Sequence, residues 1–313
     1  MDRRQERSDF LRSRRTRLTP HDVGLPDYGG RRRVAGLRRE EVAMLSSISV
    51  DYYVRLEQGR IQHVSQSVLD AISSALRLDR DEQMHLRNLV GPKDDTTLRP
   101  TTKTARAGLS QMIRTVTSGP AYVLSRHMQI LSWNYLAELV FDEIARLPAN
   151  ERNMARYVFL DSSAHDTFVD WQDAARSTAA YLRIVGGQYP DDPNLATLVG
   201  ELSLKSEDFR RKWAEHPVST RSFGNKTFAH PLVGEIPLSY EAMTPSSESG
   251  ELVFVFYPRP GTDAELTLQL LVNWGTRDCT SLPSCPDPGP TDSTSDITPR
   301  FTQTVPEKSD TAD

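Results

Sequence analysis

The chain has 313 residues, of which 37% are hydrophobic and 26% charged, and its formal net charge is −4. This composition is typical of a soluble globular protein, and no apolar run approaches the about 20 residues that a membrane-spanning helix needs. The length predicts two domains with linkers. The first residues lack the apolar segment of a signal peptide, so we expect a cytoplasmic protein.

The charge is unevenly distributed. Residues 1–90 contain 17 Arg, no Lys and 13 Asp or Glu, whereas the rest of the chain contains 21 Lys or Arg and 29 Asp or Glu. The first part is therefore basic and the second acidic. This asymmetry predicts a basic module that binds nucleic acid, joined to an acidic domain.

The first 90 residues predict five short helices. Phe10 and Leu11 give the first helix an apolar edge among arginines, and we expect a basic outer face. A second helix is expected over residues 37–45. Ser65 is expected to cap a fourth helix and Asp79 to open a fifth.

The third helix is predicted in more detail. Ser49 can cap it, while Ile48 before the cap and Tyr53 within the helix are placed to form a hydrophobic staple. Gly59 is expected to end it. Two short helices joined by a tight turn form a helix-turn-helix, and the outer side of the second helix would carry Val50, Asp51, Tyr52 and Arg55.

The string "FLRSRRTRLTPHDVGLP" followed by "GLRREEVAMLSSISVDYYVRLEQGR" resembles the phage-repressor-like helix-turn-helix domains and, more narrowly, the MmyB-like transcriptional regulators. Ser47 stands at the turn position where these domains usually have Gly. A non-Gly residue in a left-handed turn costs about 1 kcal/mol, so we expect a slightly less stable module that still binds DNA.

Two sets of residues are candidates for contacting double-stranded DNA. In the helix-turn-helix geometry the start of the second helix enters the major groove, so the base-edge candidates are Ser49, Val50, Asp51 and Tyr52. Arginines would attract the phosphates, and these are Arg31, Arg32, Arg33, Arg38, Arg39, Arg60 and, at the flank, Arg55. The alternative is that the arginines form a solvated charged face.

The second region predicts an α+β domain. The two apolar runs "AYVLS" and "MQILSW" predict a hairpin. Apolar residues at helical spacing predict a helix from Trp171, which is expected to end at Gly186-Gly187. Asp192-Pro193 and Ser206 are expected to begin two more helices. Pro237 predicts that its strand lies at an edge of the sheet. The apolar run "ELVFVFYP" predicts a central strand, and "DAELTLQLLVNWG" predicts a closing helix. We expect a sheet with helices against one face.

This order resembles the PAS-like ligand-binding domain of the same family, on strings that include "LSWNYLAELVF", "DWQDAARSTAAYLR" and "ELVFVFYPRPGT". The resemblance implies a cavity for a small apolar, fatty-acid-like molecule. The candidate walls are Trp133, Phe159, Phe168 and Trp171, and the candidate carboxylate anchors are Asn134, Arg152, Asn153 and Arg156. Taken singly, each aromatic residue is more often ordinary core than a ligand wall.

The predicted organisation is multidomain. An all-α five-helix helix-turn-helix domain occupies residues 1–90, a linker and connecting helix 91–118, an α+β PAS-like domain 119–275, and a disordered tail 276–313. The tail is rich in Ser, Thr, Pro and Asp and holds the only two cysteines, Cys279 and Cys285, which have no metal-binding spacing.

No enzyme motif is present. The histidines are scattered, and His216 and His230, each followed by Pro, have neither metal-type spacing nor a third ligand. We expect no catalytic residues, no metal and no cofactor.

Two functions remain open from the sequence. The first is a sequence-specific transcriptional regulator, a nucleoid-associated homodimer on a DNA operator, whose second domain senses a small apolar ligand. The second is an interaction module, antitoxin-like or scaffold-like, whose second domain binds a protein and no small molecule. Neither involves a membrane.

Overall fold

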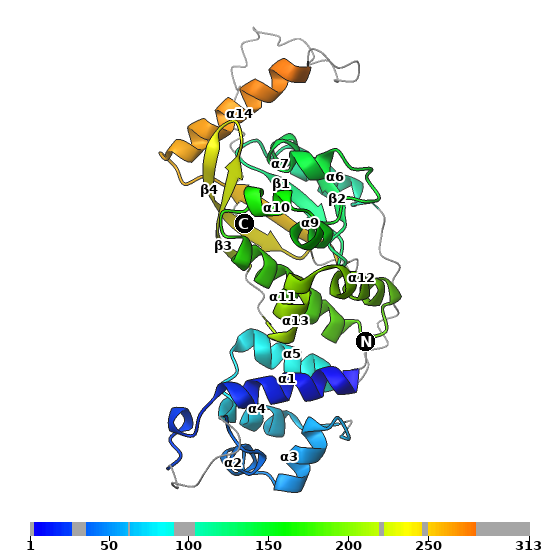
Figure 1. The fold of residues 1–313 in the computed structure, drawn as a ribbon, viewed down its shortest axis with the longest axis vertical. Helices are drawn as coiled ribbons and strands as arrows, with labels where there is room; N and C mark the ends of the chain where they lie inside the picture. Colours follow the sequence, from blue (N-terminus) through cyan, green and yellow to red (C-terminus); the bar gives the residue numbers. More distant parts are fainter. Residues whose placement is uncertain are drawn as a thin grey trace, which may run out of the picture. The chain divides into compact units, whose positions relative to one another are not determined.

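The five helices expected in the first 90 residues are all present in the computed structural model, which describes residues 3–26, 36–61, 63–90, 104–218, 222–245 and 250–279. Arg31, Arg32 and Arg33 lie outside the described residues, as do residues 280–313 of the predicted tail. The tail was predicted to begin at residue 276, but residues 276–279 belong to the helix α14 (Asp263–Cys279). The helices, shown in Figure 1, are α1 (Arg3–Arg17), α2 (Arg39–Leu45), α3 (Val50–Glu57), α4 (Gln66–Ala75) and α5 (Arg80–Val90), with the short 3₁₀ helix η1 (His21–Val23) after α1.

The predicted helix caps are confirmed. The Ser49 Oγ accepts the N–H of Tyr52 at 3.1 Å, and the Ser65 Oγ accepts the N–H of Val68 at 3.4 Å. Asp79 accepts the N–H of Glu82 at 2.9 Å, and the Glu82 carboxylate in turn accepts the N–H of Asp79 at 3.1 Å. These side chains satisfy N–H groups that a helix start otherwise leaves unpaired.

The prediction that the basic residues of α1 face outward was wrong for three arginines. Arg7, Arg14 and Arg15 are buried. Two of them meet buried carboxylates, because Arg14 lies 2.8 Å from Glu82 and Arg15 lies 3.0 Å from Glu57. An arginine stem can be buried along an apolar surface when its charged end finds such partners.

The second part of the chain combines helices with one antiparallel sheet, as predicted. The strands are β1 (Ala121–Leu124), β2 (Ile130–Trp133), β3 (Phe223–His230), β4 (Gly234–Met243) and β5 (Leu252–Tyr257). The helices are α6 (Ala107–Arg114), α7 (Tyr135–Val140), α8 (Asp142–Ala145), α9 (Met154–Leu160), α10 (Ser163–Thr167), α11 (Trp171–Gln188), α12 (Pro193–Lys205), α13 (Glu207–Ala214) and α14 (Asp263–Cys279).

The strand order is β2-β1-β5-β4-β3, so the apolar strand β5 is central, as expected. β3 was not predicted, because its sequence FGNKTFAH has neither an apolar run nor a regular alternation of polar and apolar residues, and the strand is only partly buried. The assignment of the Pro237 strand to an edge was wrong, since β4 pairs with both β3 and β5. Pro237 itself pairs only with Thr227 of β3, because β5 joins β4 from Ser239 onward.

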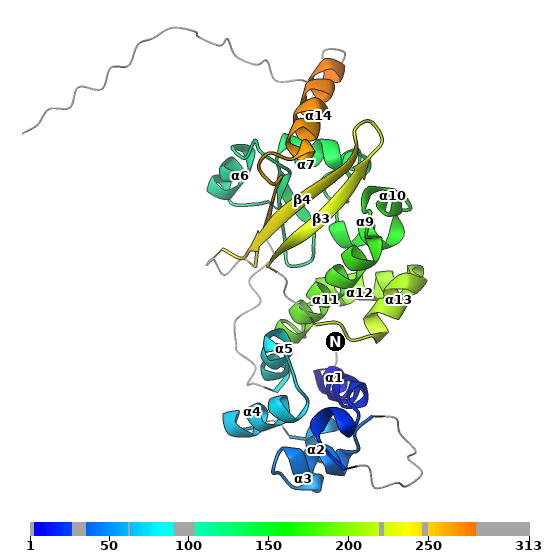
Figure 2. The same ribbon diagram turned by 90° about the vertical axis from the view of Figure 1, so that its left-hand side faces the viewer.

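Helices cover both faces of the sheet, and the expectation of a single covered face was wrong. Because side chains alternate along a strand, Tyr122 and Leu124 enter the main core on one face, whereas Ala121 and Val123 lie on the other. There they pack with α6 in a small separate cluster. Figure 2 shows α6 on one side of the strands and α9 and α10 on the other.

The helix α11 does not end at Gly186-Gly187, as the sequence suggested, but continues to Gln188. Gly187 is buried, and a Cβ at this position would lie 2.9 Å from the His85 ring of α5. The glycine therefore allows a close approach between two helices and does not form a turn. The next two predicted helix starts are confirmed, because Asp192 accepts the N–H of Asn194 and Ser206 accepts that of Phe209.

Candidate nucleic-acid interface and ligand pocket

The helices α2 and α3 form a helix-turn-helix through a tight turn. Ser47 has a φ of 54°, so it takes the left-handed conformation expected at this position. The Ile48 N–H donates to the Ala43 carbonyl at 3.0 Å and closes the turn. Tyr53 and Leu56 are fully buried and fix α3 against the bundle, which leaves its opposite side accessible.

The accessible side of α3 carries the base-edge candidates. Ser49, Val50 and Asp51 are exposed and Tyr52 is half-buried. Arg55 is exposed and lies 3.9 Å from the Asp51 carboxylate, one turn away. A short helix that presents polar and aromatic side chains at its start has the composition that a DNA-reading helix needs.

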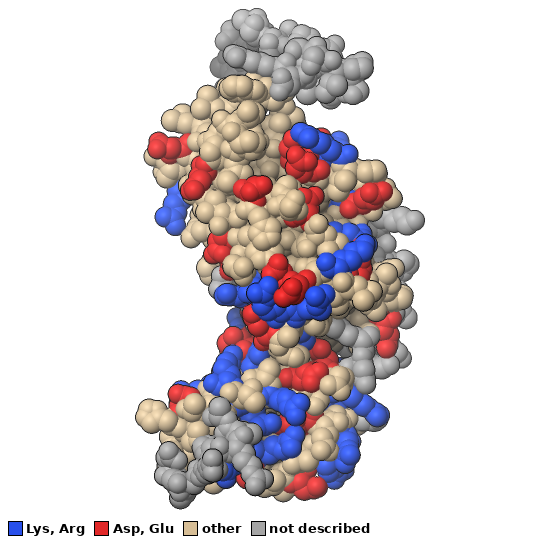
Figure 3. Space-filling model, in the orientation of Figure 1, with Lys and Arg blue, Asp and Glu red and all other residues tan. Residues whose placement is uncertain are grey.

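The phosphate candidates in the described residues differ in their surroundings. Arg38 and Arg60 are exposed, whereas the half-buried Arg39 donates to the Glu57 carboxylate at 2.8 Å. Figure 3 shows basic and acidic side chains interspersed on the drawn face of the helix-turn-helix part. Arg38 and Arg60, like Arg55, are therefore exposed for a phosphate contact, whereas Arg39 is held by a buried carboxylate.

Glu57 connects three helices. Its carboxylate is 1% exposed and accepts N–H groups from Arg15 of α1, at 3.0 and 3.3 Å, and from Arg39 of α2, at 3.0 and 2.8 Å. Burial raises the pKa of the Glu57 carboxyl, but these hydrogen bonds outweigh burial and hold the pKa below its ordinary value. The carboxylate is thus charged at neutral pH and holds α3 in place.

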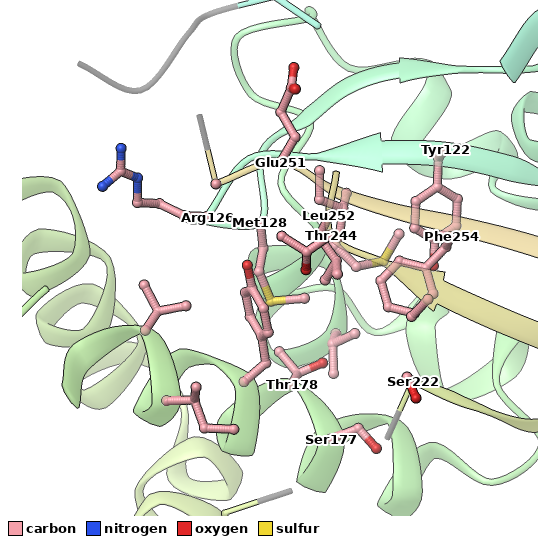
Figure 4. Close-up of a pocket in the computed structure, with 18 of the residues that line it drawn as sticks. Tyr122, Arg126, Met128, Ser177, Thr178, Ser222, Thr244, Glu251, Leu252 and Phe254 are labelled. Carbon is pink, nitrogen blue, oxygen red and sulfur yellow. The ribbon is translucent and has the colours of Figure 1, made fainter. Parts of the chain in front are cut away.

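The second domain contains a cavity of about 310 Å³ between the sheet and α11. Its walls are aromatic and aliphatic side chains of the sheet, α9 and α11, with hydroxyl groups from α11 and the strands. Figure 4 shows Ser177 and Thr178 on one side and the Tyr122 and Phe254 rings on another. The main lining residues are Tyr122, Leu124, Met128, Met154, Val158, Phe168, Ala174, Ser177, Thr178, Tyr181, Ile184, Val185, Gln188, Tyr189, Tyr240, Thr244, Leu252 and Phe254.

Three charged residues also line the cavity. The Arg126 guanidinium lies 4.5 Å from the centre of the Tyr189 ring, and Lys226 lies 3.4 Å from the Asp173 carboxylate. The Glu251 carboxylate lies 3.3 Å from Arg106. Figure 4 shows the charged ends of Arg126 and Glu251 directed away from the apolar side chains. The cavity therefore has an apolar interior and charged groups around it, which suits an amphipathic molecule.

Phe168 is the predicted ligand-site aromatic that the structure places in this cavity. Phe159 packs edge-on against Phe209, with ring centres 5.0 Å apart, and Trp171 donates its indole N–H to the Val158 carbonyl at 2.9 Å. The Arg152 guanidinium lies 4.9 Å from the Trp133 ring centre. Four of the predicted residues lie outside the cavity lining, and a role for them in ligand binding stays a prediction: Trp133, Arg152, Phe159 and Trp171.

The predicted carboxylate anchors make contacts within the protein. Asn134 caps α7 through the Ala137 N–H and donates to the Gly119 carbonyl at 2.7 Å. Asn153 caps α9 and donates to the His127 carbonyl at 2.8 Å. Arg152 donates to two backbone carbonyls, and Arg156 lies 2.8 Å from the Glu201 carboxylate. Asn153 and Arg156 line a second hollow with Glu201, away from the main cavity.

The residues that sequence reasoning missed come largely from α11 and from the β1–β2 turn. Tyr181 and Gln188 of α11 line the cavity, as do Arg126 and Met128 of the turn. The apolar period of α11 identified Thr178 and Val185 as inward residues, but it gave no reason to separate a pocket wall from core. That distinction depends on which residues of other elements lie opposite each side chain.

Among the described residues, no cluster of three or more His, Cys, Asp or Glu could hold a metal ion, and no helix is both long and apolar enough to cross a bilayer. His216 and His230 lie in separate surroundings. The Arg14 side chain contacts the His216 backbone carbonyl, whereas the His230 ring accepts the Leu232 N–H at 3.3 Å within the β3–β4 turn.

Two family models match the chain. One, described as the MmyB-like transcription regulator ligand binding domain, matches residues 105–271, which is more than half of the chain. The other, described as a helix-turn-helix domain, matches residues 8–86. No curated protein matches the chain. The first matched range contains the α11 cavity and the second contains the α3 surface, and the two matches confirm the resemblance drawn from the sequence.

Proposed function

We propose, from the premise that this chain belongs to the MmyB-like transcription regulators, that its cavity binds a small apolar, fatty-acid-like molecule and that its helix-turn-helix reads a specific operator. The chain is a DNA-binding transcription regulator with a ligand-binding domain. The proposal of an apolar ligand rests on the cavity of about 310 Å³, whose walls are aromatic and aliphatic.

The size and lining of the cavity support an apolar ligand. Small-molecule pockets typically measure about 300–1,000 Å³ and combine apolar walls with few polar groups. Here Tyr122, Phe254 and Met154 offer apolar surface, while Thr178 and Gln188 offer hydrogen bonds. A hydrocarbon chain would gain roughly 0.8 kcal/mol for each methylene group removed from water.

The charged groups around the cavity support a carboxylate end. Arg126 and Lys226 both line it, and Arg126 is buried. A charge-assisted hydrogen bond to a ligand carboxylate is stronger than a neutral one. We therefore propose these two cations, beside the predicted Asn134, Arg152, Asn153 and Arg156, as candidate anchors.

The ligand proposal is tested by extracting the purified protein and analysing the extract by mass spectrometry, followed by titration with myristate. Ala174→Phe places a ring in the cavity that Ala174 lines, and it is expected to weaken myristate binding at least tenfold. Ala196→Phe is the matched control, because Ala196 is exposed on α12, and it should bind as the wild type does. Absence of any bound lipid and of myristate binding would favour the alternative, an interaction module whose second domain binds a protein.

We further propose that Ser49, Val50, Asp51 and Tyr52 contact base edges and that Arg38, Arg39, Arg55 and Arg60, with Arg31, Arg32 and Arg33, contact or attract phosphates. The exposure of the α3 outer side and of Arg38 and Arg60 supports this assignment. Base contacts carry sequence information, whereas phosphate contacts supply affinity that depends on salt.

DNA binding is tested by fluorescence anisotropy at several salt concentrations. Arg38→Ala should weaken binding to every duplex and reduce the slope of log K against log salt by about 0.9, the value for one lost phosphate contact. Asp51→Ala should instead change the preferred sequence. Arg146→Ala, at an exposed arginine of the second domain, is the control. An unchanged salt slope in Arg38→Ala would remove Arg38 from the interface.

We propose a homodimer in the nucleoid as the working form, because helix-turn-helix modules usually bind paired half-sites about 34 Å apart. Light scattering after size-exclusion chromatography measures the mass directly, with 35.2 kDa for one chain. A single chain on a duplex that carries two half-sites would contradict the dimer.

A further inference from the structure

The helix α11 (Trp171–Gln188) is buried along most of its length because different surfaces contact different parts of the protein. Along one side, Ala174, Thr178, Tyr181 and Val185 line the cavity. Near its carboxyl end the helix also packs against α5 of the helix-turn-helix domain. One rigid element thus borders both the ligand site and the DNA-binding module.

Ile184 belongs to both environments. It lines the cavity, and it is also a member of the apolar cluster that forms the core of the helix-turn-helix domain together with Leu86, Leu89 and Val90 of α5. The side chain is only 8% exposed. Since packed interiors have few voids, a molecule that displaces Ile184 must also displace its neighbours in α5.

Gly187 brings α11 and α5 into close contact. A Cβ here would lie 2.9 Å from His85 Cε1 and 3.0 Å from His85 Nδ1, both closer than an ordinary contact. The imidazole has little room to move, because His85 is 1% exposed and its ring meets Phe10 of α1 edge-on at 5.0 Å. Only glycine fits at position 187 without separating the two helices.

Arg183 connects α11 to α1. Its side chain is fully buried, and its guanidinium donates to the Glu6 carboxylate of α1 and to the Trp213 carbonyl of α13. The guanidinium also lies 4.1 Å from the centre of the Trp213 ring. Removing either partner of a buried ion pair leaves an uncompensated charge, so the pair strongly favours one arrangement of α1 on α11.

We propose that α11 transmits occupancy of the cavity to the DNA-binding domain, through the shared side chain of Ile184 and the contacts Gly187–His85 and Arg183–Glu6. The inference rests on the proposed ligand-binding function. A ligand shifts DNA affinity only if it binds two arrangements of the protein unequally, and α11 is the element through which such a difference reaches α1 and α5.

The test compares Gly187→Ala with Gly200→Ala. Both change a helical glycine of the second domain, but a Cβ at Gly200 meets nothing within 4 Å. Affinity for a duplex selected from a random-sequence pool is measured by anisotropy, with and without saturating myristate. Myristate should change the DNA affinity of the wild type and of Gly200→Ala by the same factor, about 5- to 150-fold. In Gly187→Ala this factor should fall toward one, while myristate affinity stays within about twofold because residue 187 does not line the cavity.

Glu6→Gln tests the same coupling from the other domain, should the extra methyl group prevent folding. Glu6 lies on α1, outside the cavity lining, and its exchange for Gln keeps the size of the side chain while it removes the charge opposite Arg183. Glu40→Gln, at an exposed glutamate of α2, is its control. The myristate effect on DNA affinity should decrease in Glu6→Gln alone.

The outcomes separate the two proposals. If myristate binds but leaves the DNA affinity of the wild type unchanged, or if Gly187→Ala and Glu6→Gln keep the full effect, the role of α11 is refuted and the ligand proposal stands. If the wild type binds no myristate and yields no lipid on extraction, both proposals are refuted.

Discussion

The exchange Glu57→Gln provides a sharp test of how the DNA-binding domain is held together. The wild-type carboxylate is buried and accepts four N–H groups from Arg15 and Arg39, each within 3.3 Å. Gln is the same size but carries no charge, and its amide group supplies only one oxygen acceptor. The Arg15 guanidinium, itself buried, would lose its ionic partner.

The expected loss of unfolding free energy is about 3 kcal/mol, at the low end of the roughly 3–5 kcal/mol for breaking a buried ion pair, because Gln keeps one acceptor. With a urea m-value of about 2 kcal/mol/M, the unfolding midpoint should fall by about 1.5 M. Urea titration followed by far-UV circular dichroism measures this. All four tryptophans lie between residues 133 and 274, so their fluorescence reports separately on the second domain.

Glu40→Gln is the matched control, since Glu40 is exposed at the start of α2. It should shift the unfolding free energy by less than about 1 kcal/mol, the size of a helix-dipole interaction. A Glu57→Gln protein within about 0.5 kcal/mol of the wild type, the usual scatter of surface substitutions, would refute the role assigned to Glu57.

The same carboxylate predicts a dependence on pH. The folded-state pKa of Glu57 lies below the ordinary 4.5, because the hydrogen bonds from the two arginines outweigh burial. A lowered folded-state pKa gives stability that is fully present above pH 4.5 and is lost as the pH falls through the folded-state value. The difference in unfolding free energy between wild type and Glu57→Gln should therefore be constant from neutral pH to about 5 and should decrease at lower pH.

Three further outcomes are expected in urea titrations. Ser206→Ala removes the cap of α13 and should lower the unfolding free energy by about 1 kcal/mol. A loss under about 0.5 kcal/mol, the usual scatter of surface substitutions, would contradict the cap's contribution. Asp192→Asn should lower the unfolding free energy by about 1–3 kcal/mol, because the buried His127 ring 2.7 Å away loses its charged partner. An unchanged unfolding midpoint would argue against a stabilising role for the Asp192–His127 pair. Burial, followed by the nearby Arg183 and Arg14, lowers the pKa of His85 to about 3, so the ring stays neutral in the fold while it protonates below pH 6.5 in the unfolded chain. Stability should then fall below pH 6.5 by up to about 1.4 kcal/mol per pH unit, and His85→Phe should show a smaller pH slope.

Sequence reasoning succeeded where the signal is local. The caps at Ser49, Ser65, Asp192 and Ser206 are confirmed, because a side-chain oxygen reaches an N–H group only two or three residues away. The central position of β5 also followed from its apolar composition, since a strand covered on both faces has few polar residues.

It failed where a residue's role depends on a distant partner. Gly186-Gly187 has the composition of a helix end, yet Gly187 serves the approach of His85, which lies about 100 positions earlier in the chain. The arginines of α1 look like a solvated face until Glu57 and Glu82 are seen beside them.

The sequence by itself determined the two-part organisation, the helix-turn-helix and the side of α3 that faces outward, because helix period, caps and charge are properties of neighbouring residues. Only the tertiary structure decided which apolar residues border a cavity and which fill the core, since Phe168 and Phe159 are alike in sequence terms but face different neighbours. It also decided that α11 contacts both domains, because α11 lines the cavity and packs against α5. Ile184 and Arg183 are adjacent in the chain, but their significance comes from α5 and α1, which the fold brings against them.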